Sequence, residues 1–359
     1  MRDVPLVDVK AQYAPLIPQL EERFRSVLDS GAFIRGPEYA AFQDEAAAYL
    51  GVGQTIGVAN GTDALVLVLD ALGIGPDDEV ICPAFTFYAT AESIARRGAT
   101  PVFADIDPLT LNLDPEDVAA RITKQTRAVM PVHLFGRPAP VSEFAQLGMP
   151  VIEDAAQAFG APGTATSVVS TYSFYPTKNL FCLGDGGLVA ANDDEVADRI
   201  RMLAFHGSRD KVDFDFVGYN SRLDELQAAM LRVFLQHLDE WNRGRREAAA
   251  RYVELGLGEL VDVPEDEPGH IYHLFVCRSP ERDRIRDALT DAGISSSTYY
   301  SRPLHLQPAL RFLGWKEGSL PETERAGREN FSLPLWPGMD VSIQEQVVEV
   351  VRAAVGVRA

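Results

Sequence analysis

The sequence predicts an α/β fold in which a large domain has a mostly parallel mixed sheet covered by helices and a smaller α+β domain follows at the C-terminus. Two observations lead to this prediction. Between about residues 50 and 205, short apolar runs alternate with amphipathic helical patterns, as in a sheet with helical crossovers. In addition, 359 residues with 46% hydrophobic and 24% charged side chains suffice for two domains with buried cores.

Seven short runs in this region are predicted strands, because each is rich in apolar and β-branched residues. Helical patterns lie between them, for example at residues 62–72 and 88–98, where apolar side chains recur three and four positions apart. Ligands bind such sheets at the carboxyl ends of the strands, so the residues there are the functional candidates. The predicted strands are residues 55–60, 78–84, 100–106, 127–134, 150–156, 170–176 and 186–192.

The C-terminal part of the sequence is predicted to form the second domain. A continuous helical pattern from Glu225 to Leu255 joins it to the first. We therefore expect a large domain at residues 1–235 and a small domain at residues 236–359, on which residues 1–25 could pack. The further predicted elements are an acid-rich stretch (256–269), a strand (270–278), a helix (282–293), a proline-punctuated loop region (299–340) and a final helix (342–354).

The charge balance excludes some classes of function. With 33 basic and 52 acidic residues the formal net charge is −19, and nucleic acids are bound by clustered Lys and Arg, so we expect no nucleic-acid partner. Three scattered cysteines with no CxxC pair are typical of a reducing compartment. The N-terminus carries charges throughout, so we expect a cytoplasmic protein with no signal peptide and no membrane span.

The motif Asn60-Gly61-Thr62-Asp63 closes a predicted strand and opens a predicted helix. The free N–H groups and the positive end of a helix make such a junction an anion site, and glycine permits close approach. The alternative is an ordinary turn in which Thr62 or Asp63 caps the helix.

Asp154 and Lys178 are two further candidates. Asp154 ends an apolar run, and a buried carboxylate there needs a partner, such as a protonated ring nitrogen, unless it caps a helix. Lys178 is the first charged residue after Asp154, which favours a lowered pKa and Schiff-base chemistry. The alternative for Lys178 is a solvated surface lysine.

These residues belong to ten segments that follow one another along the chain. On these segments the chain resembles the DegT/DnrJ/StrS-type sugar aminotransferases, which are pyridoxal 5′-phosphate (PLP) enzymes of the aspartate aminotransferase fold, fold type I of the PLP-dependent transferases. The resemblance extends over almost the whole chain. The segments are VPLVDVKAQY near the start, SGAFIRGPEYAAFQ (30–43), NGTDAL (60–65), CPAFTFYATAESI (82–94), VIEDAAQAFGA (151–161), SFYPTKNLFCLGDGG (173–187), HGSR (206–209), GYNSRLDELQAA (218–229), PLHLQPA (303–309) and ERAGRENFSLPLWPGM (324–339).

The resemblance implies a role for each matching residue near the cofactor ring. Lys178 would form the internal aldimine with PLP and later shuttle a proton, and Asp154 would pair with the pyridinium nitrogen. Gln157 would hydrogen-bond the 3-hydroxyl of the cofactor. Phe87 would stack on its ring.

The resemblance also implies a phosphate site. Gly61, Thr62 and Ser173 would hold the phosphate, and Asn220 would reach the phosphate in a neighbouring subunit. We therefore expect a homodimer with shared active sites. Donors that converge locally explain how so acidic a chain can hold an anion.

Two places depart from the family pattern. Between Gly160 and Ser173 the segment is short and uncharged, which puts in doubt any substrate contact made there. The usual His-Tyr-Pro is replaced by Tyr299-Tyr300-Ser301, and the following Arg302 is a replacement donor. The substrate-side candidates are Phe33, Arg222, Tyr300, Arg302 and His305.

Two other patterns are predicted to have structural roles and no role in binding or catalysis. His270 and His273 have an HxxH spacing, but on a strand they would face opposite sides, so we expect no metal site. Arg243, Arg245 and Arg246 are predicted to form a solvated helix face.

The predicted function is transfer of an amino group from L-glutamate to a keto group of a nucleotide-linked (dTDP or UDP) deoxyhexose, through pyridoxamine phosphate, to give an amino sugar. One alternative is an aminotransferase for a cyclitol or another non-nucleotide keto acceptor. Another is a PLP-dependent sugar dehydratase, against which Lys178 argues because that group has a histidine there. The last is a non-catalytic PLP-binding regulator. Neither the sugar position that is aminated nor the nucleotide follows from the sequence.

Overall fold

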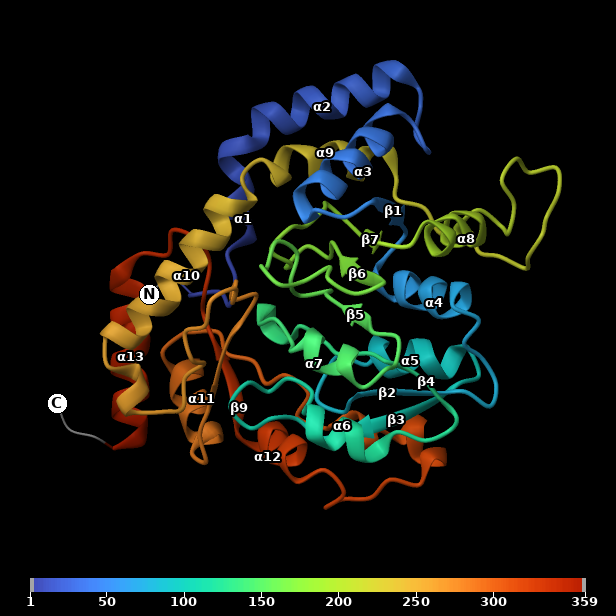
Figure 1. Cartoon of the computed structure of the whole chain (residues 1–359). Helices are drawn as coiled ribbons and strands as arrows, with labels where there is room; N and C mark the ends of the chain where they lie inside the picture. Colours follow the sequence, from blue (N-terminus) through green and yellow to red (C-terminus); the bar gives the residue numbers. More distant parts are fainter. Residues whose placement is uncertain (1–2, 357–359) are drawn as a thin grey trace.

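The computed structural model describes residues 3–356. Its centre is a mixed sheet of seven strands (Figure 1). Parallel bridges from Val129 to Val151 and from Val132 to Asp154 join its two hydrogen-bonded groups, β3-β2-β4 and β5-β6-β7-β1. β7 is antiparallel to both of its neighbours, whereas the other pairs are parallel. The strands are β1 (Gln54–Val58), β2 (Glu79–Pro83), β3 (Thr100–Ala104), β4 (Thr126–Val129), β5 (Ile152–Asp154), β6 (Val169–Ser173) and β7 (Gly187–Ala191).

All seven predicted strands are present, so the predicted α/β fold with a mostly parallel sheet is confirmed. A separate antiparallel pair, β8 (Phe275–Arg278) and β9 (Asn330–Leu333), lies in the C-terminal part. The α-helices are α1 (Val9–Tyr13), α2 (Ile17–Ser30), α3 (Pro37–Leu50), α4 (Gly61–Ala71), α5 (Ala89–Arg96), α6 (Pro115–Arg121), α7 (Val141–Gln146), α8 (Asp194–Ala204), α9 (Glu225–Leu235), α10 (Leu238–Glu254), α11 (Arg282–Asp291), α12 (Pro321–Glu329) and α13 (Val341–Val355).

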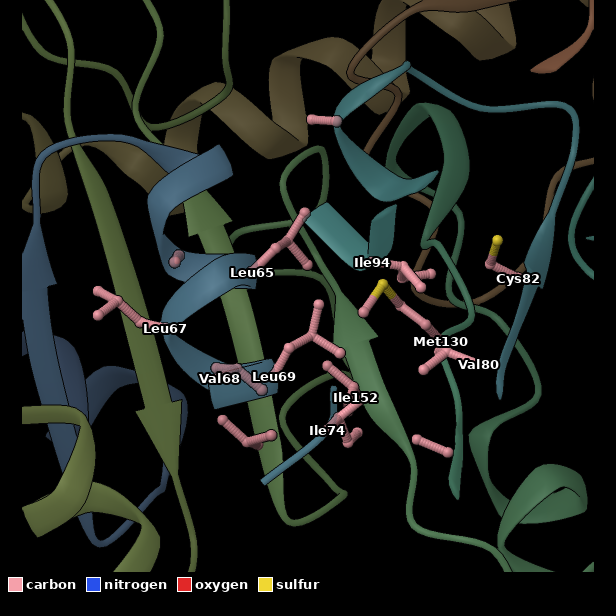
Figure 2. Close-up of a cluster of buried hydrophobic side chains, with 14 of the residues drawn as sticks. Leu65, Leu67, Val68, Leu69, Ile74, Val80, Cys82, Ile94, Met130 and Ile152 are labelled. Atoms are coloured by element: carbon pink, nitrogen blue, oxygen red, sulfur yellow. The ribbon is translucent and has the colours of Figure 1, made fainter. Parts of the chain in front are cut away.

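Both faces of the sheet are covered by apolar clusters. Leu65 and Leu69 of α4 pack with Ile94 of α5 and with Val80 and Ile152 of the sheet (Figure 2). α4 is apolar almost all round, which is typical of a helix buried between layers. On the opposite face, side chains that alternate with those of the first cluster along β7 pack against α2, α3 and α9. The sheet is therefore buried, and its strand ends and loops are the places open to ligands.

A third apolar cluster lies in the C-terminal part, among α10, α11, α13, β8 and β9. Val4 belongs to it and pairs with Ile294, so the N-terminal segment contacts these elements; residues 1–2 lie outside the described residues. α10 contributes Trp241 to a sheet-side cluster and Tyr252 to the C-terminal one. A domain boundary at residue 235 stays a prediction, because α10 packs in both clusters.

Besides the loop region predicted at residues 299–340, which contains α12 and β9, three sequence predictions are wrong in detail, two of them on this connecting helix. The continuous helix predicted from Glu225 to Leu255 is interrupted between α9 and α10, at residues 236–237. Arg245, predicted on a solvated face, is fully buried. Its guanidinium donates to the backbone carbonyls of Tyr272 and His273 at 3.4 and 3.3 Å.

The third concerns the strand predicted at residues 270–278, which begins only at Phe275. Tyr272 lies at φ 46°, in the left-handed region, and its carbonyl accepts from the buried arginine instead of from a neighbouring strand. A side chain thus supplies the hydrogen bonds that a strand partner would have supplied.

Within residues 3–356, no helix is long and apolar enough to cross a bilayer. Over the same range, no three His, Cys, Asp or Glu side chains gather as ligands for a metal ion.

Candidate active site

Three chain segments meet where the sequence candidates are found. β5 ends at Asp154, β6 ends at Ser173, and α4 begins at Gly61 directly after β1. β5 and β6 are paired in parallel, so their carboxyl ends lie side by side. The structure therefore places the candidates at one edge of the sheet, as expected for an α/β fold.

Asp154 is buried, with 4% of its surface exposed, and its hydrogen-bond partners are neutral donors. Thr90 Oγ1 donates to Oδ2 at 2.8 Å, and the Ala156 N–H donates to Oδ1 at 3.2 Å. Burial raises the pKa of Asp154, while these two donors and the nearby charge of Lys178 lower it. In the described part of the chain no cation lies within 4.0 Å of this carboxylate, so its negative charge is only partly compensated.

Lys178 lies in the turn after β6, where its backbone N–H donates to the Tyr175 carbonyl at 2.8 Å. The side chain is half-buried. Burial lowers its pKa to about 8, while the negative charge of Asp154 raises it. About half of the Lys178 side chains are thus neutral at pH 8, where a solvated surface lysine is almost entirely charged.

The start of α4 forms a narrow cradle against the ends of β6 and β7. A Cβ atom on Gly61 would lie 2.8 Å from Cβ of Ser173, and one on Gly187 would lie 2.5 Å from the backbone C and O of Asn60. Asn60 caps the helix by accepting from the Asp63 N–H at 2.8 Å, so neither Thr62 nor Asp63 is the cap. The first N–H groups of a helix have no carbonyl partner within it, so those of Gly61 and Thr62 are available for an anion beside the Ser173 hydroxyl.

Gln157 and Tyr300 form one wall of the site. Gln157 accepts from the Phe135 N–H at 2.8 Å and donates to Tyr300 Oη at 3.0 Å. The Tyr300 ring stacks on Phe135, with centroids 6.1 Å apart, and burial raises the pKa of its phenol. Phe87, between β2 and α5, is 61% exposed, which is unusual for a phenylalanine and leaves a ring face open for a ligand.

Three further substrate-side candidates have other partners or are exposed. His305 is buried, and its Nε2 lies 3.0 Å from a carboxylate oxygen of Glu324, an arrangement typical of a structural histidine. Arg302 is exposed. Phe33 is exposed as well, and its carbonyl accepts from the Glu225 N–H at 3.0 Å.

Asn220 and Arg222 lie on the segment that links α8 to α9. Asn220 is exposed, and its backbone forms an antiparallel β-bridge with Phe205. Arg222 lines a pocket beside α8. Part of the same segment extends away from the body of the molecule next to α8 (Figure 1).

Two residues of the site were missed in the sequence. Thr90 lies within the segment CPAFTFYATAESI, but a threonine in the first turn of a helix carries no signal that it will face Asp154. Gly187 directly follows Gly186, and only the approach of β7 to Asn60 explains why it has no side chain. Both residues act in the site only because segments far apart in the sequence meet there.

Comparison with known proteins shows the family. A model of the DegT/DnrJ/EryC1/StrS aminotransferase family matches residues 17–352. The chain belongs to this family. The DegT/DnrJ/EryC1/StrS aminotransferases are PLP-dependent enzymes, and this chain is accordingly an aminotransferase with that cofactor.

Three similar proteins cover nearly the whole chain. A pleiotropic regulatory protein of Geobacillus stearothermophilus is 46% identical over 97% of both chains. A dTDP-3-amino-3,4,6-trideoxy-alpha-D-glucose transaminase of Streptomyces venezuelae is 43% identical over 97% of this chain and 95% of its own. The crystal structure of S. venezuelae DesV in complex with a ketimine intermediate is 42% identical, with a TM-score of 0.95 and complete coverage of both chains.

Proposed function

We propose that this chain transfers an amino group from L-glutamate to the keto group of a nucleotide-linked hexose, with PLP as its cofactor. The observation that carries the proposal is the juxtaposition of Lys178, with a pKa of about 8, and the buried Asp154. The similarity to a dTDP-amino-sugar transaminase supports the choice of substrate class.

The residues present fit PLP. A phosphate needs several N–H and O–H donors at close range, and Gly61, Thr62 and Ser173 offer them. The approach of these segments is so close that a Cβ atom on Gly61 would collide with Ser173. A protonated ring nitrogen needs a buried acceptor, and Asp154 is a carboxylate without a cationic partner. An aromatic ring needs a flat apolar neighbour, and Phe87 exposes one.

When bound, PLP supplies an electron sink that eases removal of the α-proton from an amino acid. Asp154 would keep the ring nitrogen protonated, because a carboxylate beside it favours the charged form of that nitrogen. Gln157 fixes the orientation of the ring, and its own amide is held by the Phe135 N–H. The residues that would hold the group are thus themselves hydrogen-bonded.

Lys178 acts as the base. Its Nζ is neutral in about half of the molecules at pH 8, so it would accept the α-proton of the amino donor and return a proton to the carbon on the other side of the transferred nitrogen. Tyr300, with a neutral phenol beside Gln157, faces the same space and is proposed to contact the substrate.

A second copy of the chain is proposed to complete each site. Asn220 is exposed and makes no hydrogen bond with its side chain in the described part of the chain, so its amide is available to a partner. The extended segment that precedes it exposes Val212, Phe214 and, at 97%, Val217. Apolar side chains that project together mark a surface for association, and homodimers are the commonest assembly.

The test is a panel of UDP-, dTDP- and GDP-linked 3-keto and 4-keto hexoses with L-glutamate, scored by formation of 2-oxoglutarate. We expect turnover with at least one of these nucleotide sugars and none with the Lys178→Ala variant. Turnover only with a cyclitol ketone would show that the acceptor is a cyclitol and not a nucleotide sugar. PLP binding without turnover on either set would favour the regulatory alternative.

A further inference from the structure

A hollow of about 390 Å³ lies between the N-terminal segment and the first half of α10, and none of the cofactor-site residues named above lines it. Apolar side chains form much of its wall, namely those of Pro15, Leu16, Trp241 and Pro337. Trp241 also stacks on His237, with ring centroids 6.0 Å apart. A volume of this size with apolar walls is typical of a small-molecule site.

Gln12 of α1 lines the same hollow and is buried, with 6% of its surface exposed. Its Oε1 accepts from Nη2 of Arg245 at 3.3 Å. Because a guanidinium can only donate, this bond fixes the amide with its oxygen toward Arg245 and its NH₂ group turned away. Within residues 3–356, Nε2 of Gln12 has no hydrogen-bond partner. A buried donor without an acceptor is unfavourable, so the amide is suited to an acceptor brought by a ligand.

Arg245 places an uncompensated positive charge behind this amide. The side chain is fully buried, and all its acceptors are neutral, namely the carbonyls of Tyr272 and His273 and the Gln12 amide. Burial lowers the pKa of Arg245 to about 10, and no carboxylate in the described part of the chain offsets this effect. A buried charge without a counter-charge is unfavourable, so a negative group near Gln12 would be stabilised.

The other charges at the hollow belong to exposed side chains. Arg243 and Glu247 lie 3.8 Å apart, and their side chains are 67% and 62% exposed. Glu240 is exposed as well. Water and salt screen such charges, whereas the charge of a buried guanidinium is screened much less. The potential at the buried end of the hollow, where Gln12 lies, is therefore determined mainly by Arg245.

We infer that this hollow binds an organic carboxylate with an apolar body. Its carboxylate accepts from Nε2 of Gln12, and its body lies against Trp241 and Pro337. A carboxylate satisfies the unpaired donor and compensates the buried charge at the same time. The apolar walls favour an organic acid over an inorganic anion, which would lose its hydration there without gaining enough donors.

The first test is a crystal structure of the holoenzyme soaked with 4-bromobenzoate, which combines a carboxylate with a flat apolar ring. Anomalous scattering from bromine shows where the compound binds. We expect bromine beside Trp241 with the carboxylate directed at Gln12, whether or not a second molecule binds near Lys178. Bromine only near Lys178, or at neither place, would overturn the inference. The natural protein is used, so this result does not depend on the folding of a variant.

The second test changes the charge at Gln12. In Gln12→Glu one oxygen still accepts from Arg245, but a second, negatively charged oxygen replaces the NH₂ group. We expect the affinity for 4-bromobenzoate, measured by quenching of tryptophan fluorescence, to fall about tenfold or more. The neutral 4-bromobenzamide should bind the natural protein more weakly than the benzoate does, and this order should reverse in Gln12→Glu. Gln19→Glu, on an exposed residue of α2, is the control and should change either affinity less than about twofold.

A further result would also contradict the inference. If bromine lies beside Trp241 but the benzoate and the benzamide bind equally well to the natural protein and to Gln12→Glu, the hollow accepts an apolar ring and does not recognise a carboxylate. The inference is independent of the proposed function, because neither test requires amination of a sugar.

Discussion

Thr90 Oγ1 donates a 2.8 Å hydrogen bond to Oδ2 of Asp154, and both side chains are buried. The bond supports the ionised form of a carboxylate whose pKa burial would otherwise raise further. We expect Thr90→Val, which keeps the shape but removes the donor, to weaken PLP binding about tenfold or more. Fluorescence titration of the apoenzyme measures this affinity. Thr90→Ser is the control and should bind PLP nearly as tightly as the natural protein does. Equal PLP affinity in the Val variant would show that the Thr90 hydroxyl does not support cofactor binding.

The pKa of Lys178 predicts how cofactor capture depends on pH. Only the neutral amine reacts with an aldehyde, so the rate at which apoenzyme takes up PLP should rise with pH around a midpoint of about 8 instead of the ordinary 10.5. Because the negative charge of Asp154 raises the pKa of Lys178, Asp154→Asn should move this midpoint downward. Stopped-flow absorbance from pH 6.5 to 9.5 records both curves. A midpoint above pH 9.5 would show that Lys178 is an ordinary solvated lysine.

Gly187 controls the width of the phosphate cradle. A methyl group there would lie 2.5 Å from backbone atoms of Asn60, so Gly187→Ala must displace the start of α4. We expect PLP affinity to fall about tenfold or more, through loss of a hydrogen bond to the charged phosphate. Gly53→Ala is the matched control, because its nearest neighbour, the Ala191 carbonyl, would be at an ordinary 3.8 Å. Equal dissociation constants for the two variants would contradict this account of the cradle.

Sites shared between two copies can be tested by mixing defects. Lys178→Ala and Asn220→Asp should each have little activity alone, the second because a carboxylate would face the phosphate. A mixed dimer carries both defects in one site and none in the other, so co-expression should restore activity toward about a quarter of the natural level. Turnover of the purified mixture, with differently tagged chains, provides the measurement. No recovery in a verified mixed dimer would mean that Asn220 serves its own chain.

Much of the fold could be predicted because it depends on patterns local to each segment. Strands such as β1 and β7 carry runs of apolar residues, and α4 is apolar almost all round. The apolar pattern of each segment therefore predicts that it is buried. The segment from His270 to Leu274 has the same composition as a strand, yet its carbonyls are bonded by the side chains of Asn179 and Arg245. No local pattern shows that a distant arginine will be buried against it.

The site could be predicted in part for a similar reason. Asp154 and Lys178 stand out because each is a charge in an apolar setting, which is visible in the sequence. Thr90 and Gly187 do not stand out, since their roles come only from the meeting of separate segments. His305 is a substrate-side candidate in the sequence, but it is buried, and its Nε2 lies beside a carboxylate oxygen of Glu324 on the later helix α12.

The most direct test of the central claim is to find which lysine carries the cofactor. The holoenzyme is reduced with borohydride, digested, and analysed by mass spectrometry for a phosphopyridoxyl group. The account predicts the label on Lys178, within the peptide that follows β6, and its loss in Lys178→Ala. Label on any of the other lysines, Lys10, Lys124, Lys211 or Lys316, with none on Lys178, would contradict it.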